Sequence, residues 1–178
     1  MMSYGVVTHN RPRQLVDRID AIRRHYSVAK IFVVDNSSLE VQQINVLNLS
    51  QFANVEIHHA LHNSRFAAYN KIFELVDTEW FGLRTDDDLF DEHIVQDTLQ
   101  KHSEKEIIVH NYTYCKQPRP LETYERPLES VLFRSAIVKK HGPMSTNDPS
   151  ADWDYLRRLM SENKVALEEC CIMDKVAH

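Results

Sequence analysis

The stretch "SYGVVTHNRPRQLVDRIDAIRRHYSVAKIFVVDNSS", residues 3–38, decides the fold. Its two ends, "SYGVVTHN" and "KIFVVDNSS", are short β-branched runs that stop at polar turn residues, as strands buried on both faces do. Between them Leu15, Ile19 and Ile22 recur at helical spacing, and Pro12 occupies a first-turn position that tolerates proline. A strand, a helix and a strand within about 30 residues form a βαβ unit, which predicts a parallel sheet.

The same alternation continues along the chain. "NVEIHHA" and "EWFGLR" read as a third and a fourth strand around the helix "SRFAAYNKIFELV". A helix is expected from about Asp91 to His102, then the strands "EIIVHNY" and "ESVLFR", a short helix "SAIVKKHG" closed by Gly142, and a last helix "DWDYLRRLMSEN". The pattern predicts an α/β fold with a mostly parallel sheet flanked by helices.

Composition narrows the class of protein. The 178 residues fit one domain, 1–178, and the 21 lysines and arginines against 26 acidic residues give a formal charge of −5, so a nucleic acid partner is not expected. No run of about 18 apolar residues predicts a transmembrane segment. Cys115, Cys170 and Cys171 are an odd number without paired spacing, which favours a reducing, cytoplasmic location.

Polar side chains follow the predicted strands, at the edge where open α/β sheets bind ligands. They are Thr8 to Arg11, Asp35 to Ser37, Asn63 to Arg65 and Asp86 to Asp88. The three adjacent aspartates repel one another, and a cation or strong solvation has to offset this repulsion. The segment is therefore either a magnesium or manganese site or a solvated acidic loop that caps the following helix. The three glycines of the chain form no glycine-rich phosphate loop, so a nucleotide would be held in another way.

Four segments resemble the family 2 glycosyltransferases of the GT-A fold, in order and in spacing. They are "YGVVTHNRPRQL", "IFVVDNSS", "NSRFAAYNKIFELVDTEWFGLRTDDDLF" and "SADWDYLRRL", and they span roughly Tyr4 to Leu159. The resemblance implies a nucleotide-binding half, about residues 1–90, and a short acceptor-side C-terminal half, about residues 91–178. It also implies a nucleoside-diphosphate sugar as donor, and a UDP-sugar is expected because such donors are common in the family. The implied acceptor is a carbohydrate or glycan, and the implied reaction inverts the anomeric carbon.

The resemblance also implies roles for single residues. Those expected to bind the nucleotide sugar are Thr8, Asn10, Arg11, Asp35, Asn36, Arg65, Asn70 and Asp86. The segment "TDDD" corresponds to the DXD motif, which makes Asp86, Asp87 and Asp88 candidate ligands of manganese or magnesium. In one alignment Asp86 and Asp88 are the ligands, and in another Asp87 is the principal ligand. His178 is a further candidate metal ligand, because many such enzymes carry a histidine near the end of the catalytic core.

The segment "SADWD" resembles the family's "E-D" element, whose aspartate deprotonates the acceptor. Asp152 is therefore the expected base and Asp154 the second choice. The structural alternative is that Asp152 only caps the last helix. Two departures stand out: Ala151 replaces the expected glutamate, and "NSRFAAYNK" lacks the usual glycines. The predicted function is metal-dependent inverting glycosyl transfer. The alternatives are a catalytically impaired nucleotide-sugar binding module and a nucleotidyltransferase; the latter lacks its glycine-rich basic loop.

Overall fold

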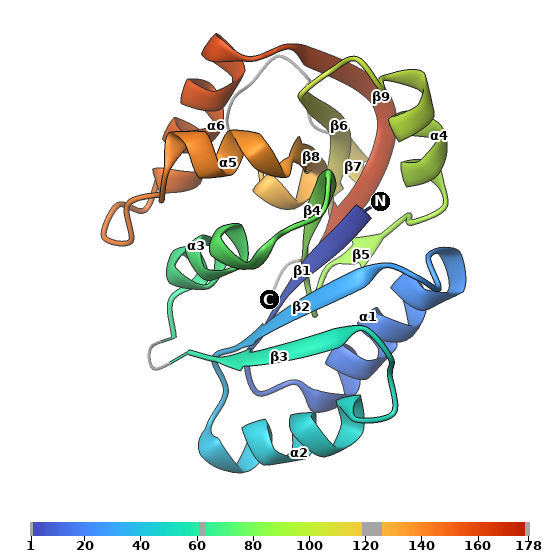
Figure 1. The fold of residues 1–178 in the computed structure, drawn as a ribbon, viewed down its shortest axis with the longest axis vertical. Coiled ribbons are helices and arrows are strands. Elements are labelled where there is room, and N and C mark those ends of the chain that lie inside the picture. The colour runs from blue at the N-terminus through green and yellow to red at the C-terminus, as the bar shows by residue number, and fades with distance from the viewer. Residues whose placement is uncertain (1, 61–62, 119–125, 177–178) are drawn as a thin grey trace.

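The architecture is a single curled sheet with helices on both faces (Figure 1). It comes from a computed structural model, which describes residues 2–60, 63–118 and 126–176. Within these ranges nine strands form one sheet in the order β3-β2-β1-β4-β8-β6-β9-β5, and β7 pairs with β6. The predicted α/β class with a mostly parallel sheet is confirmed.

The N-terminal half of the chain starts with the predicted βαβ unit. Strand β1 (Met2–Thr8) pairs in parallel with β2 (Lys30–Asp35), and helix α1 (Pro12–His25) connects them. Strand β4 (Trp80–Thr85) pairs in parallel with the other side of β1, after helix α3 (Arg65–Leu75). Both edges of β1 are therefore occupied, which places β1 in the centre of this half.

Helix α2 (Leu39–Leu49) was not predicted. It connects β2 to the edge strand β3 (Val55–His59) and buries Gln42, Asn45 and Leu49, while Leu39 and Leu47 are 78% and 73% exposed. A helix that buries polar side chains and exposes apolar ones has no apolar stripe. Periodicity analysis therefore could not find this helix.

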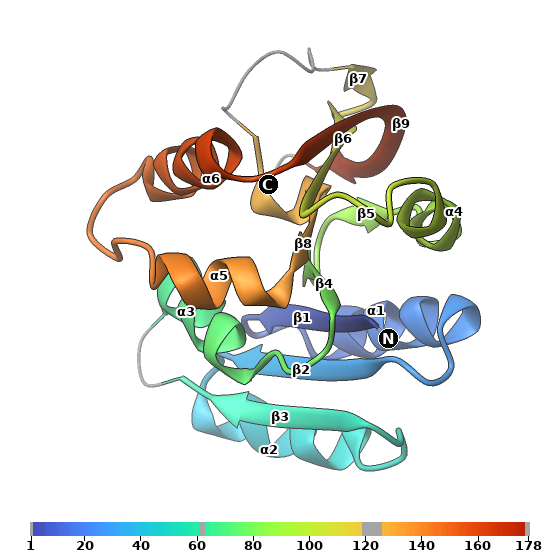
Figure 2. The same cartoon turned by 45° about the horizontal axis from the view of Figure 1, so that its top comes forward.

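The C-terminal half of the chain is less regular, and most of its strand pairs are antiparallel. Its elements are β5 (Leu89–Phe90), α4 (Ile94–Lys101), β6 (Ile107–Tyr114), β7 (Gln117–Pro118), the 3-10 helix η1 (Leu128–Ser130), β8 (Val131–Arg134), α5 (Ser135–His141), α6 (Ala151–Glu162) and β9 (Val165–Lys175). Helix α4 is shorter at both ends than predicted, and β5, β7 and β9 were missed. Strand β9 pairs in parallel with β6 and curls over the sheet (Figure 2).

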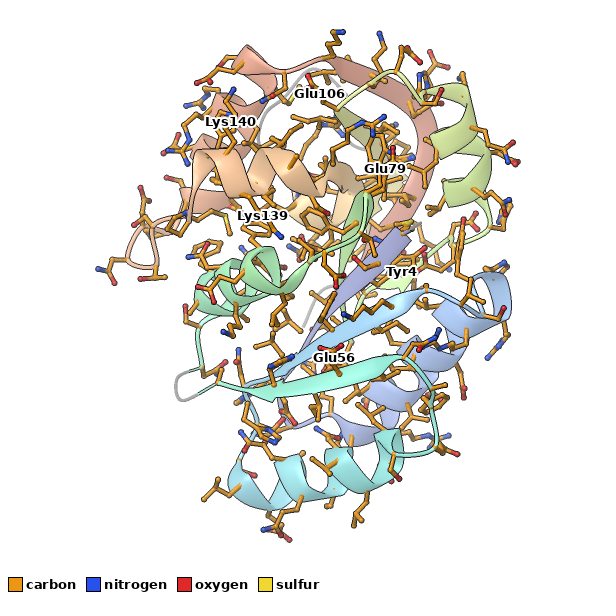
Figure 3. The ribbon with its side chains drawn as sticks, viewed as in Figure 1. Tyr4, Glu56, Glu79, Glu106, Lys139 and Lys140 are labelled. Atoms are coloured by element: carbon orange, nitrogen blue, oxygen red, sulfur yellow. The ribbon has the colours of Figure 1, made fainter. Side chains whose placement is uncertain are left out.

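The core consists of two layers, one on each face of the sheet. Helices α3, α5 and α6 pack on one face, and α1, α2 and α4 on the other (Figures 1 and 2). Gly5 of β1 lets α3 approach closely, because a Cβ there would lie 2.3 Å from Ile72. Tyr4, the preceding residue of the strand, faces the opposite layer and is fully buried (Figure 3).

No helix within the described ranges is long and apolar enough to cross a membrane.

Candidate functional site

The carboxyl ends of three parallel strands meet at one edge of the sheet. Thr8 at the end of β1 lies in register with Asp35 of β2, and Val7 with Thr85 of β4. The segments that follow these strands therefore leave the sheet side by side. This brings together the predicted residues 8–11, 35–37 and 86–88.

A cleft of about 590 Å³ opens at this edge, between α1 and the acidic turn that follows β4. Gln14, Asp17, Arg18 and Ala21 line one wall at helical spacing, and Arg11 stands at the start of the helix. The opposite wall consists of Asp86, Asp87, Asp88, Leu89 and Phe90. The cleft is therefore lined by carboxylates and guanidinium groups, a combination suited to a cation and a phosphorylated ligand.

The three aspartates of the turn point to different partners. Asp86 Oδ2 accepts from Thr8 Oγ1 at 2.6 Å and from the His9 backbone N–H at 3.3 Å. Asp87 pairs with Arg11. Asp88 Oδ2 accepts from Thr85 Oγ1 at 2.9 Å, and its Oδ1 accepts from the Val176 backbone N–H at 3.0 Å. The turn is thus bound to the end of β1, to α1 and to the end of β9.

Two of these carboxyl groups fit a divalent cation. Burial raises the pKa of Asp86 and of Asp88, and this effect outweighs the opposing effect of their hydrogen bonds, so a bound cation would stabilise both charges. In the described ranges no group of three or more histidine, cysteine, aspartate or glutamate side chains could hold a metal by itself. One or two carboxylates are enough for magnesium or manganese when water and phosphate oxygens complete the shell. His178 lies outside the described residues.

The loops after β1 and β2 are bound to each other. The Asn10 backbone N–H donates to Ser37 Oγ at 2.7 Å, and Asn10 Oδ1 accepts from the Ser38 backbone N–H at 2.9 Å. Asn10 adopts a φ of 56°, a left-handed conformation that asparagine tolerates better than most residues. The buried Asn36 Oδ1 has no hydrogen-bond partner in the part of the chain described. It is a free acceptor beside the predicted nucleotide site.

Asp35 lies deeper than a ligand contact requires. The residue is 0% exposed, and its carboxylate accepts from the Ser37 backbone N–H at 2.9 Å and from Asn45 Nδ2 at 2.7 Å. These bonds shape the turn after β2. A direct contact between Asp35 and a nucleotide stays a prediction, and the complete burial of this side chain opposes it.

Arg65 and Asp152 form an ion pair in which Arg65 Nη2 lies 3.0 Å from Asp152 Oδ2. Asp152 is the second residue of α6, whose cap position is Ser150, so it is not the cap residue. Burial raises the pKa of Asp152, an effect that Arg65 opposes and that the charge of Glu129 reinforces. A buried aspartate with a raised pKa is a stronger base than an exposed one.

Asp154 and Asn70 lie in different surroundings. Asp154 is exposed and pairs with Arg157 at 2.9 Å on the surface of α6. The Asn70 side chain donates to Met144 O at 2.9 Å and accepts from Met144 N at 2.8 Å. Asn70 thus connects α3 to the loop after α5, and its predicted contact with the donor stays a prediction.

The family model described as Glycosyl transferase family 2 matches residues 3–158. The chain belongs to glycosyl transferase family 2. No curated protein matches the chain.

Solved glycosyltransferases share the fold of this family 2 chain. S. aureus TarS 1-349 in complex with UDP-GlcNAc is 12% identical with a TM-score of 0.79 over 99% of this chain and 58% of that one. The mannosyltransferase PcManGT from Pyrobaculum calidifontis, in complex with GDP-Man and Mn²⁺, is 12% identical with a TM-score of 0.77 over 98% of this chain and 56% of that one. The chain therefore spans less than two thirds of the length of either protein.

Sequence reasoning missed two residues near this family 2 site. Arg18 is 8% exposed and interrupts the apolar stripe of α1, since Leu15 lies three residues before it and Ile22 four residues after it. Glu129 is 1% exposed and accepts a hydrogen bond from Tyr69. Arg18 could have been found from the sequence, because it is a charged residue within the apolar stripe of α1. Glu129 lies in a 3-10 helix, which gives no periodic signal.

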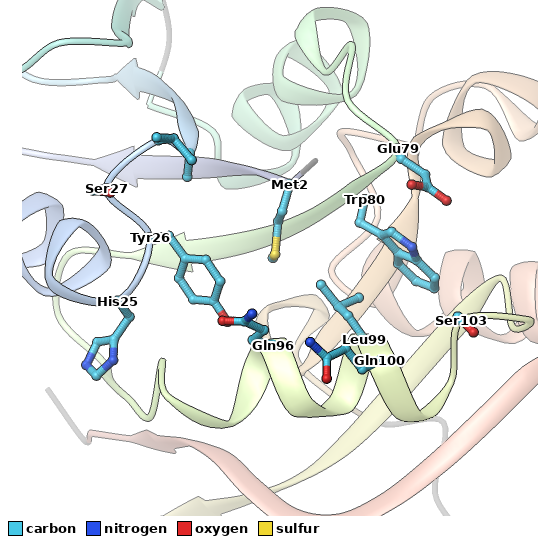
Figure 4. Close-up of a pocket in the computed structure, with 12 residues that line it drawn as sticks. Met2, His25, Tyr26, Ser27, Glu79, Trp80, Gln96, Leu99, Gln100 and Ser103 are labelled. Carbon is cyan, nitrogen blue, oxygen red and sulfur yellow. The ribbon is translucent and has the colours of Figure 1, made fainter.

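A second cleft, of about 570 Å³, lies at the opposite edge of the sheet, where the strands begin (Figure 4). Its walls carry Met2, Tyr26, Trp80 and Leu99, together with Gln96 and Gln100 of α4. Glu79, the one carboxylate among its lining residues, pairs with Arg134. This cleft matches the first in size but offers no set of carboxylates for a cation.

Proposed function

We propose that the chain is a metal-dependent inverting glycosyltransferase that moves a sugar from a nucleoside-diphosphate sugar, most simply a UDP-sugar, to the hydroxyl of a carbohydrate acceptor. The observation that carries this proposal is the cleft at the carboxyl ends of the strands, where three aspartates face Arg11 and Arg18, together with the ion pair of Arg65 and Asp152. Burial alone would lower the pKa of Arg65, but Tyr69, Glu129, Asp152 and Asp88 raise it overall. The charges that act on Arg65 thus include Asp152 and Asp88 of the acidic turn, which supports a cation site, a diphosphate-binding arginine and a base near one another.

We place the nucleotide at the ends of β1 and β2. Thr8, Asn10, Arg11 and Asn36 would surround it, and the unpaired Asn36 Oδ1 supports this because it could accept from a base or ribose donor. The UDP-GlcNAc of the TarS complex and the GDP-Man of PcManGT support a nucleoside diphosphate here. The three cysteines, all free thiols, support a cytoplasmic location.

Asp86 and Asp88 would hold manganese or magnesium together with the diphosphate, and Asp87 would keep Arg11 at the rim through their ion pair. The Mn²⁺ of the PcManGT complex supports this assignment. When bound, the ion would neutralise charge that develops on the leaving diphosphate. Arg65 would add a second positive charge on the acceptor side.

The transfer itself would be a single displacement. Asp152 takes the proton of the acceptor hydroxyl, the oxygen forms a bond to the anomeric carbon, and the bond from that carbon to the diphosphate breaks. The electron pair leaves with the nucleoside diphosphate, whose charge Arg65 offsets. Asp154 is a poor alternative base, because it is exposed and paired with Arg157.

Asp152 and the diphosphate of the donor would compete for the guanidinium of Arg65. In this structure it holds Asp152, whereas in the donor complex it would turn to the diphosphate and leave Asp152 free for the acceptor. Donor binding would therefore activate the base. The same observation favours the second candidate function, a nucleotide-sugar binding module, if Arg65 does not release Asp152.

A transfer assay distinguishes the two functions. Release of UDP or GDP from a panel of nucleotide sugars with Mn²⁺ should occur with the wild type and fall about 100-fold or more in Asp152→Asn. Asp154→Asn serves as the matched control and should retain the rate. Donor binding without turnover in the wild type would support the binding module, and absence of donor binding would contradict both.

A further inference from the structure

We propose that Arg18 positions the acidic turn so that its carboxylates meet the cation and the diphosphate together. This inference rests on the proposed function and deepens it. Arg18 belongs to none of the motifs that indicate glycosyl transfer. Its role follows from the two backbone oxygens that it binds.

The guanidinium of Arg18 bridges the two ends of the turn. Its Nε donates to Thr85 O at 3.2 Å and its Nη2 donates to Asp88 O. These oxygens belong to the last residue of β4 and to the third aspartate, so one side chain spans the whole acidic segment. The planar fork of arginine can bind two acceptors in fixed geometry, which a lysine ammonium cannot do as well.

The surroundings of Arg18 show that its position is built into the fold. The residue is 8% exposed, although burial lowers the pKa of a guanidinium and so opposes its charge. Its Cζ lies 4.6 Å from the centre of the Phe90 ring, which follows the turn in the chain. A buried charge is costly unless hydrogen bonds compensate it, and the two backbone oxygens of the turn supply such bonds here.

The turn is held both through its side chains and through its main chain. Thr85 Oγ1 and the Val176 N–H orient the Asp88 carboxylate, while Arg18 holds the main chain on both sides of the aspartates. Without Arg18 the turn would keep its side-chain bonds, including the pair of Asp87 with Arg11 at the start of α1, but would lose both main-chain bonds to the body of the helix. Asp86 and Asp88 would then sample positions in which they no longer face the same ligand.

The chain offers a matched control on the same helix. Arg23 of α1 also binds backbone oxygens, since its Nη1 donates to Ser27 O at 2.9 Å and to Ala29 O at 2.6 Å. Those oxygens lie at the opposite edge of the sheet, beside the second cleft. Arg23→Met removes a comparable clamp without touching the acidic turn.

The test measures Mn²⁺ affinity by electron paramagnetic resonance at saturating UDP, and again with GDP, together with the melting temperature of each protein. Arg18→Met should weaken Mn²⁺ binding about tenfold or more, because the freed turn would adopt the binding-competent arrangement only about a tenth of the time. Arg23→Met should lower the melting temperature but leave Mn²⁺ affinity unchanged. Arg18→Lys, which keeps the charge and one bond, should give an intermediate affinity and carries the test if Arg18→Met does not fold.

Each remaining outcome decides a separate question. If Arg18→Met or Arg18→Lys binds Mn²⁺ as tightly as the wild type and only loses stability, Arg18 is structural and the inference is overturned. The same holds if Arg23→Met weakens Mn²⁺ binding equally. If the wild type binds no Mn²⁺ with either nucleotide, the proposed function itself is refuted, and the role of Arg18 falls with it.

Discussion

The two clefts of this chain have nearly the same volume, about 590 and 570 Å³, yet their chemistry differs. They lie at opposite ends of the same parallel strands. The cleft at the carboxyl ends is lined by aspartates and arginines, whereas the cleft at the amino ends is lined mainly by uncharged side chains such as Met2, Trp80 and Gln96. The difference teaches that strand direction identifies the candidate site here, while cavity size does not.

The largest expected effect belongs to the second cleft. Trp80 is 5% exposed, so Trp80→Ala should destabilise the fold by about 3 to 5 kcal/mol, the usual cost of removing a buried aromatic side chain. Denaturant unfolding measures this loss. The UDP affinity of the remaining folded protein should be unchanged. A loss of UDP affinity would contradict the claim that the second cleft takes no part in nucleotide binding.

A smaller effect is expected at Asp35, at the carboxyl edge. Asp35→Ala leaves the Ser37 N–H and Asn45 Nδ2 without their acceptor, which should cost about 1 to 3 kcal/mol of stability. UDP affinity of the folded protein should also fall, about tenfold, since the turn that carries Asn36 loses its support. Calorimetric titration paired with a melting curve measures both. Lower stability with intact affinity would show that Asp35 has no part in the nucleotide site.

The smallest expected effect is a gain. Asp152→Asn frees Arg65 for the diphosphate, so UDP with Mn²⁺ should bind about two- to fivefold more tightly, a modest change because Arg65 is partly exposed and its ion pair is screened. The gain should vanish in the double variant Arg65→Met with Asp152→Asn. Asp154→Asn is the control and should bind UDP as the wild type does. A loss of affinity in Asp152→Asn would contradict the exchange of partners by Arg65.

The sequence predicted the central strands well, because β1, β2 and β4 are continuous apolar runs that end in polar residues. It could not predict α2, whose inward residues include Gln42 and Asn45. It also missed β9, whose alternation of buried and exposed residues is broken by register shifts against β6. Pattern methods detect periodic burial, so irregular elements escape them.

The candidate site shows a similar division. The positions of Thr8, Asn10 and the aspartates at the strand ends followed from the sequence, since strand ends are readable. The pairing of Arg65 with Asp152, 87 residues apart, and the two backbone bonds of Arg18 depend on tertiary structure. Such contacts leave no local signal in a single sequence.

The central claim is that the cation and the nucleotide bind at the carboxyl edge of the sheet. Two N–H groups report on the two regions, because the His9 backbone N–H donates to Asp86 at 3.3 Å and Trp80 lies in the second cleft. Trp80 is separated from Thr85 by the length of β4, about 16 Å. Mn²⁺ added with UDP should therefore enhance the relaxation of the His9 backbone N–H signal in NMR spectra more strongly than that of the Trp80 indole N–H. Equal or stronger relaxation of the Trp80 signal would contradict the claim.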